Sequence, residues 1–195
     1  MSLTLLTFLP LVGALLVLLL PAGQTAIMRL VALGATLATA VVGVMAYLAF
    51  DGTQAGVQMA QVEPWFTLPG GVEVHYRLGL DGLSILMVGL TAVLMPVVIL
   101  STWGHVEHRI KEFLVWMLVM ETGMLGVFLS LDLVLFYVFW EVSLIPLYCL
   151  VGVWGGERRL YATVKFFLFT LAGSLVMMIG VISLLWRFGS SDVVE

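Results

Sequence analysis

The sequence of 195 residues is 62% hydrophobic and 10% charged, with a mean hydropathy of +1.17. Because soluble domains carry about 25% charged residues, this composition excludes an ordinary soluble enzyme and indicates an integral membrane protein. The formal net charge of −4 gives no support for nucleic-acid binding. The single cysteine, Cys149, excludes an internal disulfide framework and a four-cysteine metal site.

Six apolar stretches predict transmembrane helices. A helix needs about 20 apolar residues to cross the hydrocarbon core of a bilayer. Stretches of this kind cover residues 3–21, 26–50, 82–103, 113–130, 132–155 and 161–186. The first contains Pro10 and has no basic segment before it, so we interpret it as a retained helix rather than a secretory signal. The predicted fold class is an all-α integral membrane bundle, with residues 1–195 forming one membrane domain.

The connection over residues 51–81 differs from the apolar stretches. Prolines and glycines interrupt it, and the segment after Gly71, VEVHYRL, alternates in the manner of a strand. We therefore expect a small external β-hairpin with Gly70 and Gly71 at its turn. Asp81 or Ser84 is expected to cap the exposed amides of the helix that follows.

The distribution of basic residues predicts that the N-terminus lies outside. Cytoplasmic loops of membrane proteins carry an excess of Lys and Arg. With the N-terminus outside, the inner side holds five basic residues and the outer side two. The inner five are Arg29, Arg109, Lys111, Arg158 and Arg159, and the outer two are Arg77 and Arg187. We expect a multi-pass protein in the cytoplasmic membrane of a bacterium or in an equivalent energy-coupling membrane. The inverse topology is the alternative.

Glu141 is the strongest candidate for a functional residue. No other charged residue lies between Asp132 and Glu157. A charge at the bilayer centre costs roughly 2.5–3.5 kcal/mol on insertion scales, so an intramembrane acid indicates a functional site. Desolvation favours the neutral form, which suits a group that takes up and releases a proton. Pro146 lacks an amide hydrogen and is expected to kink the helix beside this acid, freeing the carbonyl of Val142.

Glu121 is a second acid within an apolar stretch. The short SLD turn between the fourth and fifth stretches brings Glu121 and Glu141 to nearly the same level in the membrane. If both side chains faced the interior, they could share a proton and titrate as a coupled pair. The sequence does not show whether they do.

Lys165 lies near the inner end of the sixth stretch. Buried there, it would be an acceptor on a proton path, and Thr163, Thr170 and Ser174 would accompany it at helical spacing. Alternatively, its flexible stem extends to the inner membrane surface. Both interpretations stay open.

The sequence predicts no resident metal or redox cofactor. His105 and His108 flank Glu107 on an inner loop, but two ligands are a weak metal signal, and we interpret both as part of a solvated interface. The chain has no glycine-rich nucleotide loop after a strand and no cysteine cluster. We therefore expect no NADH, flavin, iron-sulfur or quinone chemistry in this chain.

Several motifs together resemble one family. FWEVSLIPLY, WGGERRLY and KFF follow one another in the second half of the chain, and HYRLGLDGLSILM leads into the third helix. This arrangement resembles the antiporter-like, proton-translocating subunits of respiratory complex I, most closely the subunit M (ND4) type. The resemblance covers nearly the whole chain.

The resemblance implies a membrane-arm subunit of an NADH-quinone oxidoreductase that passes protons outward. Electron transfer from NADH to quinone in other subunits would drive it, so the implied partners are the other membrane-arm subunits, the lipid bilayer and protons. Glu141 matches the essential helix glutamate of this family, and Lys165 matches a lysine near the start of the next helix. Glu121 aligns with the family less closely. The enzyme assignment is therefore to a translocase complex, with no redox active site in this chain.

The chain departs from this family in length. The family's subunits are longer and contain two inverted repeats, the usual plan of such transporters. We expect the 195 residues to be an N-terminal portion in which the first repeat begins near residue 113 and is incomplete. We do not expect this portion to pump protons alone. Two alternatives remain, a subunit of a homologous cation/proton antiporter or membrane-bound hydrogenase, and a non-conducting membrane scaffold. Neighbouring genes or co-purifying subunits would distinguish an oxidoreductase subunit from an antiporter or hydrogenase subunit.

Overall fold

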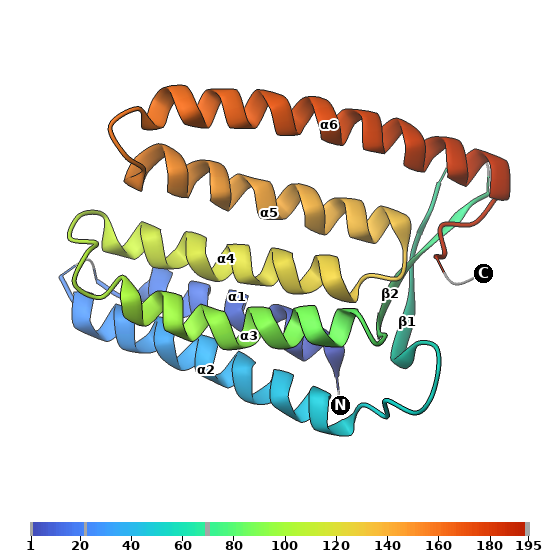
Figure 1. The fold of residues 1–195 in the computed structure, drawn as a ribbon, viewed down its shortest axis with the longest axis horizontal. Coiled ribbons are helices and arrows are strands. Elements are labelled where there is room, and N and C mark those ends of the chain that lie inside the picture. Colours follow the sequence, from blue (N-terminus) through green and yellow to red (C-terminus); the bar gives the residue numbers. More distant parts are fainter. Residues whose placement is uncertain (1, 22, 69–70, 194–195) are drawn as a thin grey trace.

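A computed structural model describes residues 2–21, 23–68 and 71–193. Its six helices run side by side, and a two-stranded hairpin lies across one end of them (Figure 1). The helices are α1 (Leu3–Leu19), α2 (Thr25–Ala49), α3 (Ser84–Ser101), α4 (Ile110–Leu129), α5 (Leu133–Trp154) and α6 (Arg159–Phe188), and the strands are β1 (Gln58–Thr67) and β2 (Glu73–Leu80). Among the described helices, five are long and apolar enough to cross a membrane, and α1 is shorter, at 17 residues. The predicted helical membrane fold with a hairpin is confirmed.

The helix ends differ from the predicted ones for local reasons. Helix α1 stops at Leu19 because Leu20 precedes Pro21 and is extended, with φ −73° and ψ 143°. Helix α3 begins at Ser84, where the Asp81 carboxylate accepts hydrogen bonds from the amides of Leu83 (3.0 Å) and Ser84 (2.7 Å). The expected capping by Asp81 is therefore confirmed.

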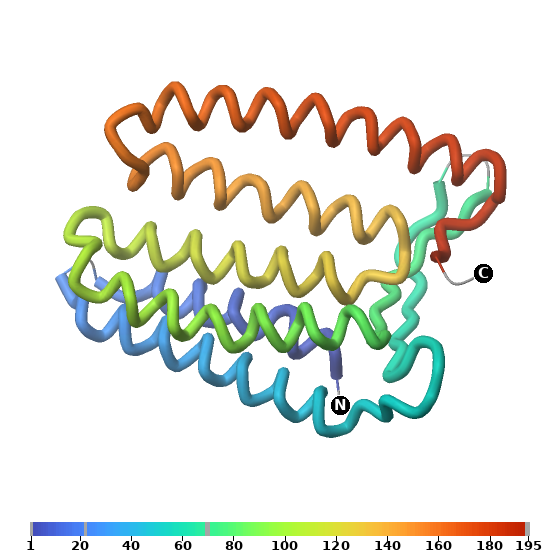
Figure 2. The backbone as a smooth tube through the Cα atoms, in the orientation of Figure 1, coloured from blue at the N-terminus to red at the C-terminus, as the bar shows by residue number. Residues whose placement is uncertain are grey.

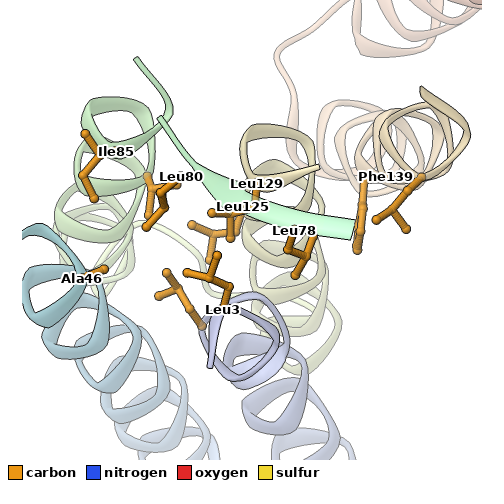
Figure 3. Close-up of a cluster of buried hydrophobic side chains, with 11 residues drawn as sticks. Leu3, Ala46, Leu78, Leu80, Ile85, Leu125, Leu129 and Phe139 are labelled. Atoms are coloured by element: carbon orange, nitrogen blue, oxygen red, sulfur yellow. The ribbon is translucent and has the colours of Figure 1, made fainter. Parts of the chain in front are cut away.

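Helices α1 to α4 pack together, while α5 and α6 form a layer beside α4 (Figure 2). Residues of β2 close the hairpin end of the core (Figure 3). Leu78 and Leu80 of this strand are fully buried against leucines of α1 and α4. The hairpin is therefore part of the folded core, which the sequence did not indicate.

The hairpin is antiparallel, with Val62 opposite Arg77. At its turn the amide of Leu68 donates to the carbonyl of Val72 over 2.8 Å. Gly71 has φ +85°, a left-handed conformation that glycine adopts without strain. The predicted hairpin is confirmed, while Gly70, the other residue expected at the turn, lies outside the described residues.

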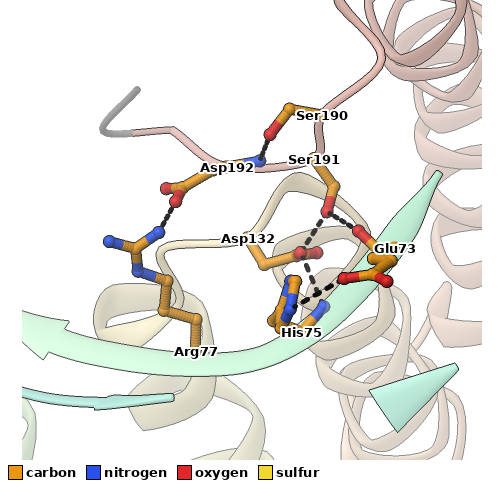
Figure 4. A network of polar contacts seen from close by, with 7 residues as sticks. All are labelled: Glu73, His75, Arg77, Asp132, Ser190, Ser191 and Asp192. Atoms are coloured by element: carbon orange, nitrogen blue, oxygen red, sulfur yellow. Dashed lines mark hydrogen bonds and ion pairs between the residues drawn. The ribbon is translucent and has the colours of Figure 1, made fainter. Parts of the chain in front are cut away.

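A polar network ties the segment after α6 to the hairpin and to α5 (Figure 4). The buried Asp132 carboxylate caps α5 by accepting from the amides of Val134 (2.8 Å) and Leu135 (3.0 Å). It also accepts from the amide of His75 and contacts the hydroxyl of Ser191. An ion pair between Arg77 and Asp192 completes the network. Elements far apart in sequence thus meet at the start of α5.

We expect Asp132→Ala to lower the free energy of unfolding by about 1–3 kcal/mol, because it removes a helix cap and leaves further donors without their acceptor. Asp132→Asn should recover part of this loss, since asparagine is also a good cap. Asp51→Ala is the matched control, because that carboxylate bonds only within its own exposed turn in the described contacts. Denaturant unfolding in detergent measures all three, and a wild-type stability for Asp132→Ala would contradict the prediction.

Candidate functional site

Glu141 lies in the middle of α5, eight residues after Leu133. One oxygen of its carboxylate, Oε1, is buried and has no hydrogen-bond partner among the described residues. A buried polar group without a partner lowers the stability of the fold, so the side chains around Glu141 are the ones that could interact with it.

One face of α5 packs closely on α4. A side-chain carbon added at Gly126 would overlap the ring of Phe139, and one added at Gly123 would lie 2.9 Å from the Cβ of Ser143. The two glycines therefore let the helices approach, as small residues do at helix contacts in membranes. Because Glu141 lies two residues from both Phe139 and Ser143, about 200° around the helix, it points away from α4.

The opposite face of α5 packs on α6. A carbon added at Gly152 would lie 3.4 Å from Cγ2 of Thr163, and the rings of Tyr148 and Phe167 are 5.1 Å apart between centroids. Seven residues is close to two helical turns. The helices are antiparallel, so the residue seven positions before Tyr148, Glu141, lies at the level of the residue seven positions after Phe167, the buried Ser174. Glu141 therefore faces α6 opposite Ser174.

Tyr137 joins this contact, one turn before Glu141 on the same face of α5. Its phenol interacts with the Glu141 carboxylate and with the Ser174 hydroxyl. The Ser174 hydroxyl donates to the carbonyl of Leu171 over 3.1 Å, which leaves its oxygen able to accept. Sequence reasoning missed Tyr137, although its spacing of four residues from Glu141 could have found it.

Pro146 lies buried inside α5, five residues after Glu141. Because proline has no amide hydrogen, the carbonyl of Val142 lacks its usual partner four residues on. This carbonyl is a further acceptor beside the acid.

Glu121 is fully buried, and neither of its carboxylate oxygens has a partner among the described residues. Like Glu141, it lies eight residues from the end of its helix at the α4–α5 turn, so the two acids share a level as expected. Its neighbours one turn away, Leu118 and Leu125, pack into the core with α1. Glu121 therefore faces α1 while Glu141 faces α6, and the structure does not bring the two carboxylates together.

Lys165 lies on the exposed face of α6. Its Nζ is 5.7 Å from the centre of the Tyr161 ring, one turn nearer the start of the helix. Thr163, two residues earlier, is buried against Gly152. Since residues two apart point to nearly opposite sides of a helix, Thr163 and Ser174 belong to the face on α5 and do not accompany Lys165. Nor does the structure bring Lys165 to Glu141.

The two loop histidines serve local contacts. Nδ1 of His105 is 3.0 Å from the carbonyl oxygen of Ser101, and the His108 ring stacks on Trp154 at 6.3 Å. Within the described ranges, no group of three or more His, Cys, Asp or Glu residues could hold a metal ion.

Comparison with known proteins agrees with this architecture. A family model described as NADH:quinone oxidoreductase/Mrp antiporter, TM, matches residues 130–195. NADH-quinone oxidoreductase subunit M of Rhodobacter capsulatus is 41% identical over 196 residues, a match that covers 98% of this chain and 37% of that protein. A chain of respiratory complex I from Thermus thermophilus with bound NADH superimposes with a TM-score of 0.81 at 34% identity, over 99% of this chain and 38% of that one.

A chain of the archaeal membrane-bound sulfane sulfur reductase also superimposes, with a TM-score of 0.82 over 97% of this chain and 38% of that chain. At 20% identity this match shows the fold alone. Fold and sequence together define an antiporter-like membrane subunit. The chain is a homologue of NADH-quinone oxidoreductase subunit M, the ND4 type, which confirms the resemblance seen in the sequence motifs. It spans 37% of the length of the Rhodobacter capsulatus protein and 38% of the Thermus thermophilus chain.

Proposed function

We infer that this chain supplies a proton-carrying site to a membrane-arm subunit of an NADH-quinone oxidoreductase. Electron transfer from NADH to quinone in other subunits would drive outward proton transfer through it. The observation that supports this function is the Glu141 carboxylate, which has a buried oxygen and interacts with Tyr137 between two membrane helices. Other membrane-arm subunits and the bilayer are the partners of this proposal.

In this function Glu141 exchanges the proton. Its neutral form avoids the cost of a charge in hydrocarbon, and its ionised form gains a hydrogen-bond donor from the Tyr137 hydroxyl. Tyr137 can both donate and accept, so it orients the carboxylate and passes a proton along α5. The free carbonyl of Val142 gives a water molecule an acceptor on the other side of the acid.

Glu121 and Lys165 have separate places in the proposal. Glu121 is a proton-holding group in the α1–α4 core, and it exchanges only through water or a movement of the helices, since it is fully buried and has no partner among the described residues. Lys165 sits near the start of α6, on the face away from Glu141. It acts on the acid through its charge or through a group that contacts this outer face.

Two other functions share part of this site. A subunit of a cation/proton antiporter or of a membrane-bound hydrogenase would use the same glutamate and lysine, and the matching family model is named for both an oxidoreductase and an antiporter. A non-conducting scaffold would use the helices only for packing. The proteins that co-purify with the chain distinguish the first of these, and replacement of Glu141 distinguishes the second.

The orientation is also a proposal, with the N-terminus and the hairpin outside. In a Cys149→Ala background, a cysteine introduced by Thr53→Cys should react with a membrane-impermeant maleimide in intact cells. A cysteine introduced by Gly156→Cys should react only after the membrane is opened. Gly156 lies on the side that holds five basic residues, against two on the other side, and this side is expected to be the cytoplasm. The reverse labelling pattern would establish the inverse topology.

We expect Glu141→Ala to reduce proton pumping about tenfold or more, in line with the loss of a proton-transfer group. The measurement uses a chimera in which this chain replaces the matching part of Rhodobacter capsulatus subunit M, with pumping assayed in membrane vesicles. Glu141→Asp should retain part of the activity, since it keeps the carboxyl group. Glu157→Ala, in the exposed loop after α5, is the control and should pump normally.

Assembly is measured in the same vesicles by the amount of the complex and its rate of quinone reduction without a proton gradient. A Glu141→Ala complex that assembles and pumps at the control rate would show that the carboxylate is structural. The scaffold function would then replace the proton-carrying one.

Tyr137→Phe should lower pumping less than Glu141→Ala and should shift the infrared C=O band of protonated Glu141, because it removes one hydrogen-bonding neighbour of that carboxyl. The band is assigned by its loss in Glu141→Gln. Tyr148→Phe is the matched control, since Tyr148 lies on the same face of α5 but contacts the Phe167 ring. Equal effects of the two tyrosine changes on the band would refute the role given to Tyr137.

A further inference from the structure

An apolar groove of about 410 Å³ runs between α2 and α3. Its floor is narrow where the helices touch, since a carbon added at Gly43 would lie 3.1 Å from the Cβ of Ala92. Exposed aliphatic side chains such as Val44 and Leu90 form its rim. Gly89 also lines the groove, and a side chain there would meet nothing within 4 Å. The absence of side chains at Gly43 and Gly89 thus leaves the groove open.

Toward the hairpin end this groove continues into a second hollow of about 530 Å³. The two share Tyr47, Ile85 and Leu86 in their walls, so they are adjacent. Beyond these residues the lining changes to the turn after α2 and the Asp81–Gly82 segment before α3. Side chains added at Gly52, Gly56 or Gly82 would also meet nothing within 4 Å. The space is therefore apolar between the helices and polar where they end.

Asp81 is the one charged side chain among the described residues that line this second hollow. Hydrogen bonds from the backbone amide of Ser84 first, and then from the Ser84 side chain and the Leu83 amide, hold the pKa of the Asp81 carboxyl below its usual value, against a smaller opposing effect of burial. The group is therefore ionised at neutral pH. Its lone pairs beyond the capping oxygen remain acceptors.

We propose that this groove binds one phospholipid with a primary ammonium head group, such as phosphatidylethanolamine. One acyl chain lies along Gly43 and Gly89 between α2 and α3, and the ammonium group hydrogen-bonds to the Asp81 carboxylate. The order of the lining, apolar within the membrane and polar at its surface, is the order of groups in such a lipid. An anionic head group would meet the Asp81 charge without a compensating cation in the hollow.

A transmembrane helix from another subunit fits the same surface less well. It would need an apolar contact along its length, whereas this hollow turns polar and acidic beyond Tyr47 and Leu86. The glycines also leave a narrow space suited to a single acyl chain. A neighbouring helix is nevertheless an outcome that the experiment separates.

The test uses the 195-residue chain purified in detergent and incubated with equal amounts of phosphatidylethanolamine and phosphatidylglycerol. Native mass spectrometry then counts the lipid retained on each molecule. The wild type should retain one phosphatidylethanolamine severalfold more often than phosphatidylglycerol. Gly89→Leu should lose most of this lipid, because Gly89 lines the groove and a Cβ there meets nothing within 4 Å, so the new side chain can occupy the groove. Gly180→Leu, at an equally open glycine of α6, is the matched control and should retain it.

Asp81→Asn separates the head group from the acyl chain. Asparagine keeps the oxygen that caps α3 and removes the charge, so lipid should stay bound while the preference for phosphatidylethanolamine is lost. Circular dichroism establishes that each variant keeps its helix content. Equal retention of the two lipids by the wild type would overturn the head-group assignment. Unchanged retention by Gly89→Leu would overturn the groove as the site. If that variant retained its lipid but the corresponding chimera failed to assemble, the groove would be a subunit interface instead.

Discussion

The close contact between α4 and α5 decides which way Glu141 points. Gly123 and Gly126 remove the side chains that would hold the helices apart, and Ser143 and the Phe139 ring occupy the space. With that face of α5 fixed on α4, helical geometry turns the residue midway between them toward α6. The acid is consequently enclosed at a helix–helix interface, where hydroxyl groups can reach it, rather than exposed to lipid.

The same contact separates the two buried acids. Glu121 and Glu141 share a level in the membrane, yet α4 and α5 present them to different neighbours. Neither carboxylate oxygen of Glu121 has a partner among the described residues, whereas Tyr137 interacts with Glu141. A carboxyl group exchanges protons only with groups that it can contact, directly or through water. This difference in surroundings favours Glu141 as the exchanging group and gives Glu121 a slower, storage role in the proposed path.

Much of this fold could be predicted from the sequence, because membrane helices, turn residues and capping residues are local signals. Hydropathy predicted every helix, and the alternating segment after Gly71 predicted the hairpin. The level of the two acids followed from helix rise alone. The facing of Glu141 and Lys165 could not be predicted, because both helices are apolar on nearly all sides and hydrophobic periodicity therefore does not mark the packed face. Contacts such as Asp132 with Ser191 join residues far apart in the chain and leave no local pattern.

The position of Lys165 defines how it can influence Glu141 without touching it. Ser174, which lies opposite the acid, is nine residues further along α6, about 14 Å by helix rise. Because Lys165 and the acid lie on opposite sides of α6, their charges are further apart than this rise, and at an effective dielectric constant near 20 they interact by at most about 1 kcal/mol. In the proposed path, a lysine on the outer face of α6 therefore acts on the acid only through its charge, and a partner that neutralised or moved this charge would remove that interaction.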